Sequence, residues 1–285
     1  MSEVPRIIKH WRIIRDHVPH WTPTQQLEQL AAWVRAGQRF YYTRFNDGEC
    51  AMMSPTQHSK AALAKGQHRW ERQLCKDMRV TFDEVLANLW SIDREDSNER
   101  LMVGSWWSSF RLGDLPPLEE LAWLGGKIKD AGLTQHRWAW PDLWYSSFGE
   151  TADCTDGSTE ALLGLLKAIP SAVVIGNERI KPVVEEHGWA FVQVSMDNCW
   201  SEGPRVLDEV RRQLNEADDL AIWCCGQPAK VWAWKLWREG LGSHLDAGHL
   251  LDRAAGVSSR DWHERDAIHR REYDKLIGPW LRGEA

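Results

Sequence analysis

The feature that most constrains the fold is a regular alternation of short apolar runs and amphipathic segments in the second half of the chain. The apolar runs have the length of strands and cover residues 172–175, 190–194, 220–225 and 243–246. Segments with helical spacing separate them, at residues 180–187, 204–216 and 228–239. Strands that alternate with helices of this length form βαβ units. The sequence therefore predicts a parallel sheet that is covered by helices on both faces.

The first half is less regular but contains the same kinds of element. Buried strands are predicted at residues 38–43 and 101–105, and an aromatic segment at 137–144 could be another. Helices are predicted at residues 4–18, 22–35, 58–90, 116–131, 158–168 and 258–276. Neither repeats nor low-complexity linkers occur, so we expect one domain over residues 1–285, with N-terminal helices (1–37), a core (38–250) and a C-terminal helix (251–285). The predicted class is α/β, a Rossmann-like, mostly parallel sheet with helical additions at the N-terminus, middle and C-terminus.

Composition excludes several functional classes. The 35 Lys and Arg residues against 41 Asp and Glu give a net charge of -6, which offers no general electrostatic case for nucleic-acid binding. The six cysteines have neither zinc-finger nor CxxC spacing, so a reducing cytoplasm is expected. No apolar run is long enough to span a membrane, and no signal-peptide core is present. We expect most of the 19 tryptophans to lie in the core.

An acidic turn follows the strand at residues 38–43. Its sequence is Arg44-Phe45-Asn46-Asp47-Gly48-Glu49, so that two carboxylates stand one residue apart. Carboxylate oxygens suit Mg²⁺ or Mn²⁺, which take one or two protein carboxylates and complete their shell with water and substrate phosphates. The same pattern also occurs in solvated loops, so the metal site is a hypothesis that depends on the rest of the chain.

Two further polar turns follow later strands. CGQPAK, at residues 225–230, lies where a buried strand gives way to a helix, and such a turn can bind an anion. Gly226 would permit close approach of the backbone, and Lys230 could add a charge to a bound phosphate or lie exposed. After the next strand, Asp246 and His249 could complete a metal shell or position a phosphate.

Other strand ends carry side chains that could bind a ligand. Asn177, Glu178 and Arg179 follow the strand at 172–175, Asp197 and Asn198 follow the next, and Trp106 and Trp107 follow the strand at 101–105. Because the carboxyl ends of parallel strands lie at one edge of a sheet, these turns predict a single ligand crevice.

These segments together resemble the GT-D fold glycosyltransferase family. RFNDGE is similar to the family signature R-x-G-D-G-E, and CGQPAKVWAWKLWREG followed by LDAGH is similar to G-P-T-A-x-V-L-A-x-x-L-x-x-x-G followed by D-x-G-H. VVIGNERI and MDNCW extend the resemblance, which covers residues 38 to 250 in order. The chain departs from the pattern at Asn46, where the family has Gly, and at Gln227-Pro228, where it has Pro-Thr. Asp252 lies three residues after the His rather than two.

The resemblance implies a role for each matching residue. Asp47 and Glu49 would be the D-x-E pair that holds Mn²⁺ or Mg²⁺ on the diphosphate of a nucleotide sugar, with Arg44 as the third catalytic residue. Asp246 and His249 would lie beside the metal. The resemblance also implies that Gly226 and the helix start beside it face the diphosphate. With the strand-end side chains described above, the residues expected to bind substrate are Gly226, Gln227, Lys230, Asn177, Glu178, Arg179, Asn198, Trp106 and Trp107.

The predicted function is that of a metal-dependent glycosyltransferase. It would move a sugar from a nucleotide sugar, with a UDP-sugar as the leading candidate, to a hydroxyl on a glycan, a glycoprotein or a modified nucleic-acid base. One alternative is a DNA-base glycosyltransferase acting on hydroxymethylated pyrimidines, because aromatic platforms can stack a flipped base. The side chains that motivate it are Trp106, Trp107, Arg111, Trp138 and Trp140.

A second alternative, motivated by the altered GQPAK turn, is a non-catalytic module that binds sugar nucleotides. The general base, if there is one, is left open among Asp114, Asp153 and Asp156. The sequence does not determine the donor sugar, the acceptor, whether configuration is retained or inverted, or the oligomeric state.

Overall fold

The computed structural model describes residues 21–45, 49, 52–53, 72–92, 99–105, 118–130, 139, 158–215, 219–257 and 273–284. The strands in these residues are β1 (Arg39–Phe45), β2 (Glu99–Ser105), β3 (Val173–Gly176), β4 (Ala190–Gln193), β5 (Leu220–Cys224) and β6 (Ser243–Asp246). The α-helices are α2 (Pro23–Arg35), α5 (Arg72–Ile92), α6 (Leu118–Asp130), α8 (Ser158–Ala168), α9 (Lys181–Glu186), α10 (Gly203–Gln213), α11 (Pro228–Arg238) and α14 (Gly278–Leu281). Shorter helical turns are η3 (Glu178–Ile180), η4 (Cys199–Glu202) and η5 (Tyr273–Ile277).

All six strands belong to one parallel sheet. Their order is β2-β1-β6-β5-β3-β4, so β6, the last of these strands along the chain, lies between β1 and β5. In register, Phe45 of β1 is opposite Ser105 of β2, and Tyr42 of β1 is opposite Leu245 of β6. The predicted α/β class with a parallel sheet is therefore confirmed.

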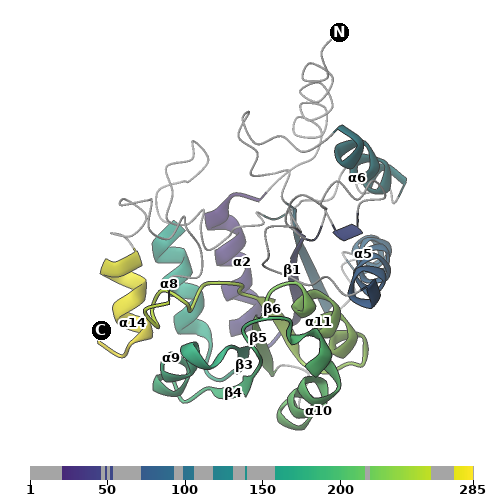
Figure 1. The fold of residues 1–285 in the computed structure, drawn as a ribbon. Coiled ribbons are helices and arrows are strands. Elements are labelled where there is room, and N and C mark those ends of the chain that lie inside the picture. The colour runs from purple at the N-terminus through teal and green to yellow at the C-terminus, as the bar shows by residue number, and fades with distance from the viewer. Residues whose placement is uncertain are drawn as a thin grey trace.

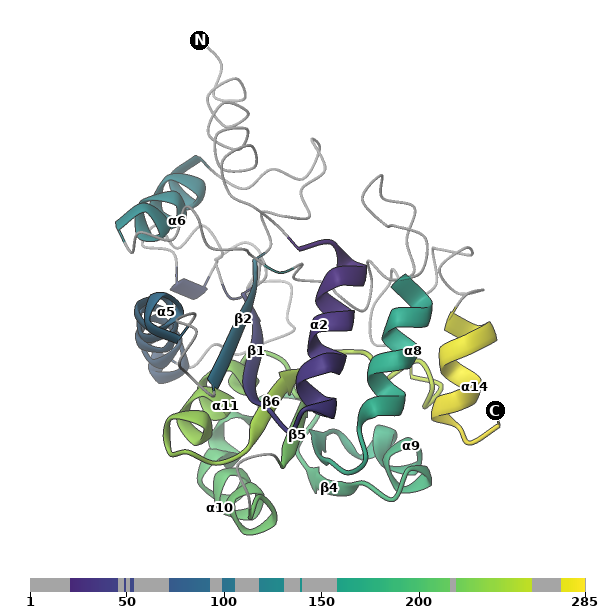
Figure 2. The same ribbon diagram turned by 180° about the vertical axis from the view of Figure 1, so that it is seen from behind.

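Helices cover both faces of the sheet because alternate residues of the strands point to opposite sides. In β1, Tyr41 and Phe45 belong to the core cluster that includes side chains of α5, α10 and α11, whereas Phe40 and Tyr42 belong to the cluster that includes side chains of α2, α8 and α9. Figure 1 shows α2, α8 and α14 side by side on the second face, and Figure 2 shows the same layer from behind. No helix in the described ranges is both long and apolar enough to cross a membrane.

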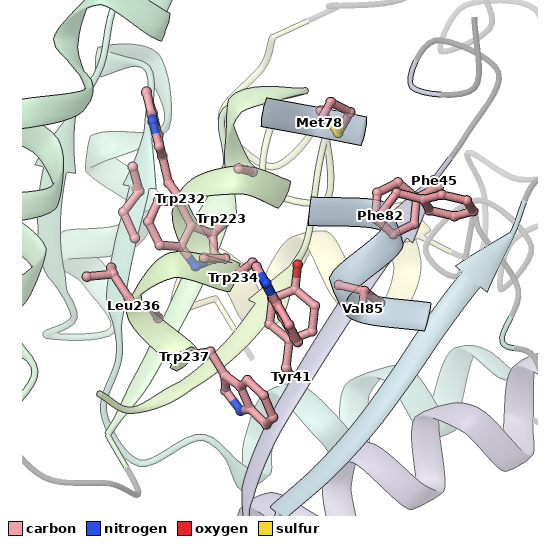
Figure 3. Packing of buried hydrophobic residues seen from close by; sticks show 14 of the residues in the cluster. Tyr41, Phe45, Met78, Phe82, Val85, Trp223, Trp232, Trp234, Leu236 and Trp237 are labelled. Carbon is pink, nitrogen blue, oxygen red and sulfur yellow. The ribbon is translucent and has the colours of Figure 1, made fainter. Parts of the chain in front are cut away.

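Aromatic side chains fill much of the first face (Figure 3). Trp234 and Trp237 of α11 stack at 5.1 Å between ring centroids, and Tyr41 meets Trp234 edge-on at 5.2 Å. At the other end of β1, Phe45 meets Phe82 of α5 at 4.9 Å. As expected, these tryptophans lie in the core, where large aromatic rings bury the most apolar area.

Helix α2 begins where the sequence predicts. Thr22 is the N-cap, its side chain accepts from the backbone of Gln25, and the Gln25 side chain accepts from the backbone of Thr22. Pro23 occupies the first helical position, where its missing N–H costs nothing. Gly37 then takes a positive φ of 59°, which ends the helix and leads into β1.

Some boundaries differ from the prediction. β1 continues through Arg44 and Phe45, which were expected in the turn, because they pair with Gly104 and Ser105 of β2. The segment at 180–187 begins as the tighter turn η3, and the expected loop at 195–203 contains η4. Several predictions lie outside the described residues, namely the helix at 4–18, residues 58–71, the segment at 137–144 apart from Ala139, and residues 258–272.

Candidate functional site

Sheet order decides which of the predicted turns lie next to one another. The carboxyl ends of the parallel strands all lie along one side of the sheet, which we call the carboxyl edge. β1, β6 and β5 are adjacent in the sheet, so the turns that follow them lie together at the middle of this edge. The next strand is β3, and the helix that follows it, α9, packs on the opposite face from α11, which follows β5. Connections that leave neighbouring strands on opposite faces open a crevice in α/β proteins. This edge is therefore the expected ligand-binding edge.

Four charged side chains meet at this edge, and we call them the central ion cluster: Arg44, Glu49, Lys230 and Asp246. The Lys230 ammonium lies 3.1 Å from Glu49 Oε1 and 3.0 Å from Asp246 Oδ2, and it donates to the Gly226 carbonyl at 3.2 Å. Arg44 Nε lies 3.4 Å from Asp246 Oδ2. The cluster thus joins the ends of β1, β6 and β5.

The central ion cluster is almost completely buried. Side-chain exposure is 2% for Lys230, 4% for Asp246, 6% for Glu49 and 10% for Arg44. Desolvation lowers the pKa of Lys230, but the charges of Asp246 and Glu49 outweigh it, so its pKa lies above the ordinary value. The two positive and two negative charges sum to zero, which makes their burial tolerable.

Gly248, in the segment Asp246–Leu250, shapes the cluster. Its φ is +53°, and a Cβ at this position would lie 1.7 Å from Arg44 Nη2. The amides of Ala247 and Gly248 both donate to the Trp223 carbonyl, at 3.0 and 3.1 Å. The glycine of the D-A-G-H segment is therefore required both by its backbone conformation and by the closeness of the Arg44 guanidinium.

His249 turns toward a different carboxylate. Its Nδ1 lies 2.8 Å from Oδ2 of Asp252, a buried acid, and about a third of its side chain is exposed. Within the described ranges, no three His, Cys, Asp or Glu side chains form a group that could hold a metal ion. The predicted role of His249 beside a metal therefore stays a prediction.

The residues present fit a hard divalent cation in their chemistry. Glu49 and Asp246 offer buried carboxylate oxygens, and Asp246 Oδ1 has no hydrogen-bond donor among the described residues. Buried acceptors of this kind require a partner. Lys230 lies between the two carboxylates, however, so a cation could reach both only if this side chain moved. Asp47, the expected second acid of the turn, lies outside the described residues.

The CGQPAK turn offers fewer free backbone N–H groups than expected for a turn at the start of a helix. Gly226 has a φ of +70° with nothing near its Cβ position, so the backbone is open there. The amides of Ala229 and Lys230 donate to the carbonyls of Gly226 and Gln227, and Pro228 has no N–H. Any phosphate at this turn would thus rely on the amides of Gly226 and Gln227.

One contact beside this turn was not expected from the sequence. The Cys199 thiol donates to the Cys225 carbonyl at 3.7 Å. A side-chain hydrogen bond with the Cys225 thiol lowers the pKa of Cys199 against the effect of burial. Burial raises the pKa of Cys224, which is followed directly by this turn. The cysteines of the described part, Cys75, Cys199, Cys224 and Cys225, are free thiols.

The outer turns share the carboxyl edge but belong to β3 and β4. Asn177 caps η3 by accepting from the Arg179 amide at 3.0 Å, while Glu178 and Arg179 are exposed. Asn198 is exposed and left-handed, with a φ of 52°. Their roles in binding substrate stay predictions. Residues outside the described part are Asp47, Trp106, Trp107, Arg111, Trp138, Trp140, Asp114, Asp153 and Asp156.

The orientation of the Lys230 side chain is the main feature of the site that the sequence did not predict. The sequence offered a phosphate contact or an exposed side chain, and the structure buries it between two carboxylates. A signal was present, because Lys230 lies three, four and seven residues before Ala233, Trp234 and Trp237 and so shares their face of the helix. Those three side chains are apolar and buried, and the same face is buried at the first turn of the helix.

Comparison with known proteins bears on the fold. No protein-family model matches the chain, and no curated protein sequence matches it. Three solved structures are similar, each 14% identical in sequence. One is the selenomethionine-substituted structure of domain of unknown function 1792 (DUF1792), with a TM-score of 0.56 over 95% of this chain and 93% of that chain. The second, of the highly conserved domain of unknown function 1792, has a TM-score of 0.56 over 96% and 98% of the two chains.

The third is described as a new glycosyltransferase (DUF1792) from Streptococcus sanguinis, with a TM-score of 0.53 over 91% of this chain and 93% of that chain. Similarity at this level of identity carries the fold alone. The second structure is described as having a distinct glycosyltransferase fold. The expectation drawn from the sequence motifs is therefore confirmed at the level of architecture: this chain has the fold of the DUF1792 structures.

Proposed function

We propose that the protein is a metal-dependent glycosyltransferase that moves a sugar from a nucleotide sugar, with UDP-sugars as the first candidates, to an acceptor hydroxyl. The central ion cluster is the observation that carries this proposal. It places two buried carboxylates and two cations at the carboxyl edge of the sheet, in a fold shared with structures described as glycosyltransferases. The two carboxylates suit a divalent metal ion, and the Lys and Arg side chains suit the phosphate oxygens of a diphosphate that carries this ion.

Glu49 and Asp246 would hold Mn²⁺ or Mg²⁺, together with Asp47 of the same acidic turn. When bound, the ion would stabilise the negative charge that develops on the leaving diphosphate. Arg44 would neutralise phosphate charge while holding Asp246 in place. Gly226, whose backbone is open, would let the diphosphate approach the start of α11.

The function can be tested by calorimetric titration of UDP in the presence of Mn²⁺. We expect Asp246→Asn to weaken UDP binding by roughly tenfold or more, equivalent to about 1.4 kcal/mol. Asp47→Ala should have a similar effect. Asp208→Asn is a matched control, because Asp208 is an exposed acid on α10 with 72% of its side chain accessible. Equal UDP binding by wild type and both site variants would contradict the proposal.

Catalysis requires its own measurement. Purified protein should release UDP from at least one UDP-sugar in the presence of Mn²⁺, through transfer or slow hydrolysis, and Glu49→Gln should abolish this release. If UDP binds as expected but no nucleotide sugar in a broad panel is turned over, the site would be that of a binding module instead.

A further inference from the structure

Lys230 stands where two physical rules disfavour a cation. It is the third residue of α11, whose N-cap is Gln227, and the amino end of a helix favours negative charge. Its side chain is also only 2% exposed, whereas an unpaired ammonium is rarely buried. The contacts with Glu49 and Asp246 are what make this position tolerable. Lys230 is thus held by the same carboxylates that would bind a metal.

The ammonium takes the space that a cation bound by both carboxylates would need. Its nitrogen lies 3.1 Å from one acid and 3.0 Å from the other. Mg²⁺ requires carboxylate oxygens at about 2.1 Å, so the ion and the ammonium cannot lie between the two acids together. Arg44 adds a second positive charge beside Asp246. Lys230 and Arg44 offset the negative charge of Glu49 and Asp246, so this carboxylate pair attracts a free divalent ion less than it would without the two cations.

We propose that Lys230 is a built-in counter-ion that keeps divalent cations out of the Glu49–Asp246 pair until a nucleotide diphosphate arrives. The inference rests on the proposed function and adds an order to it. An incoming diphosphate adds negative charge beside Lys230 and Arg44, and its oxygens offer the Lys230 ammonium new partners. The carboxylates are then released to the metal. Metal and nucleotide bind as one unit, and each must raise the affinity of the other by the same factor.

Titration of Mn²⁺ alone, followed by the spin-resonance signal of free Mn²⁺, tests the inference without turnover. The wild-type protein should bind Mn²⁺ weakly, and a saturating concentration of UDP should tighten the protein's Mn²⁺ binding by roughly 5- to 150-fold, the usual range of coupling between sites. Lys230→Met keeps the length of the side chain and removes its charge. This variant should bind Mn²⁺ without UDP, more tightly than wild type by a factor in the same range.

Lys235→Met is the matched control, because Lys235 is exposed on the same helix. It should behave as wild type, and adding Glu49→Gln to Lys230→Met should remove the gained affinity. If Lys230→Met does not fold, Lys230→Gln takes its place. The Mn²⁺ affinity of the wild-type protein with and without UDP still tests the inference without any variant. Stoichiometric Mn²⁺ binding by wild type that is indifferent to UDP would overturn the inference. In that case UDP still binds, whereas failure of the proposed function would show as no UDP binding at any Mn²⁺ concentration.

Discussion

At the scale of single residues, Gly248 shows how closely backbone and functional side chain constrain each other. Its left-handed conformation disfavours any side chain, and the Arg44 guanidinium fills the volume where a Cβ would stand. Arg44 is itself buried against Asp246. A methyl group at position 248 would therefore displace a charge from the central ion cluster, an effect beyond the strain on the backbone.

Replacing Gly248 by Ala should separate these two effects when compared with Gly256→Ala. Both glycines have a positive φ, of +53° and +70°, but nothing lies near the Cβ position of Gly256. Each variant should lose about 1 to 2 kcal/mol of unfolding free energy from the left-handed conformation. Gly248→Ala should lose roughly a further 1 kcal/mol from overpacking and should also weaken binding of UDP with Mn²⁺. Urea unfolding and calorimetry measure the two quantities, and identical behaviour of the two variants would contradict the steric argument.

The sequence predicted part of the central ion cluster at this scale. It singled out Glu49 as part of an acidic turn, Asp246 as an acid after a predicted strand, and Arg44 through the resemblance of its turn to the family signature. It named Lys230 too, but as a phosphate contact or an exposed side chain. The direction of a flexible side chain depends on partners from distant elements, and no local pattern records that Glu49 and Asp246 lie on either side of it.

At the scale of elements, the pairing of β5 with β6 contains a buried polar contact. His244 of β6 accepts from the indole of Trp223 of β5 through Nδ1, at 3.1 Å, and its Nε2 lies 2.8 Å from the Leu241 carbonyl. These partners require a neutral imidazole with the proton on Nε2. Burial lowers the pKa of His244 to about 3. The stability of this strand pair is therefore expected to depend on pH.

The sign of this dependence follows from proton binding. An unfolded histidine has a pKa of about 6.5, so below that pH the unfolded chain binds a proton that folded His244 does not. Unfolding free energy should therefore fall as pH falls from 6.5, by roughly 1.5 kcal/mol between pH 6.5 and 5. His244→Gln should remove this part of the slope in urea unfolding, whereas His187→Gln should keep it. An unchanged slope in His244→Gln would show that other groups cause the dependence.

Element types could largely be predicted from the sequence, whereas their boundaries and their order in the sheet could not. Alternating apolar and amphipathic segments indicated each strand and each α-helix between 158 and 246, but not the helical turns η3 and η4. β1 extends to Phe45 because this residue pairs with Ser105 of β2 and its ring packs on Phe82 of α5, both of them contacts between distant segments. β6 lies between β1 and β5 for the same kind of reason, since strand order depends on which surfaces fit together.

At the scale of the whole molecule, a parallel sheet has two unlike edges. The carboxyl edge carries the central ion cluster, and the amino edge carries a different arrangement around Arg39, the first residue of β1. Arg39 pairs with Glu99 of β2, donates to the carbonyls of Gly242 and Trp237, and lies over the Trp237 ring at 4.8 Å. One guanidinium thus links β1 to β2, to the segment before β6 and to the end of α11.

If the two edges are energetically independent, Arg39→Met should lower the unfolding free energy of the protein and leave its ligand binding unchanged. The loss of several charge-assisted hydrogen bonds should lower the unfolding free energy by roughly 2 to 4 kcal/mol. Arg35→Met, at an exposed position on α2, should change it by less than about 0.5 kcal/mol. Affinity for UDP with Mn²⁺, measured well below the unfolding transition, should be the same in both variants as in wild type. A weaker affinity in folded Arg39→Met would mean that a structural change at the amino edge is transmitted along β1 to Arg44. Ligand binding would then depend on contacts at both edges of the sheet.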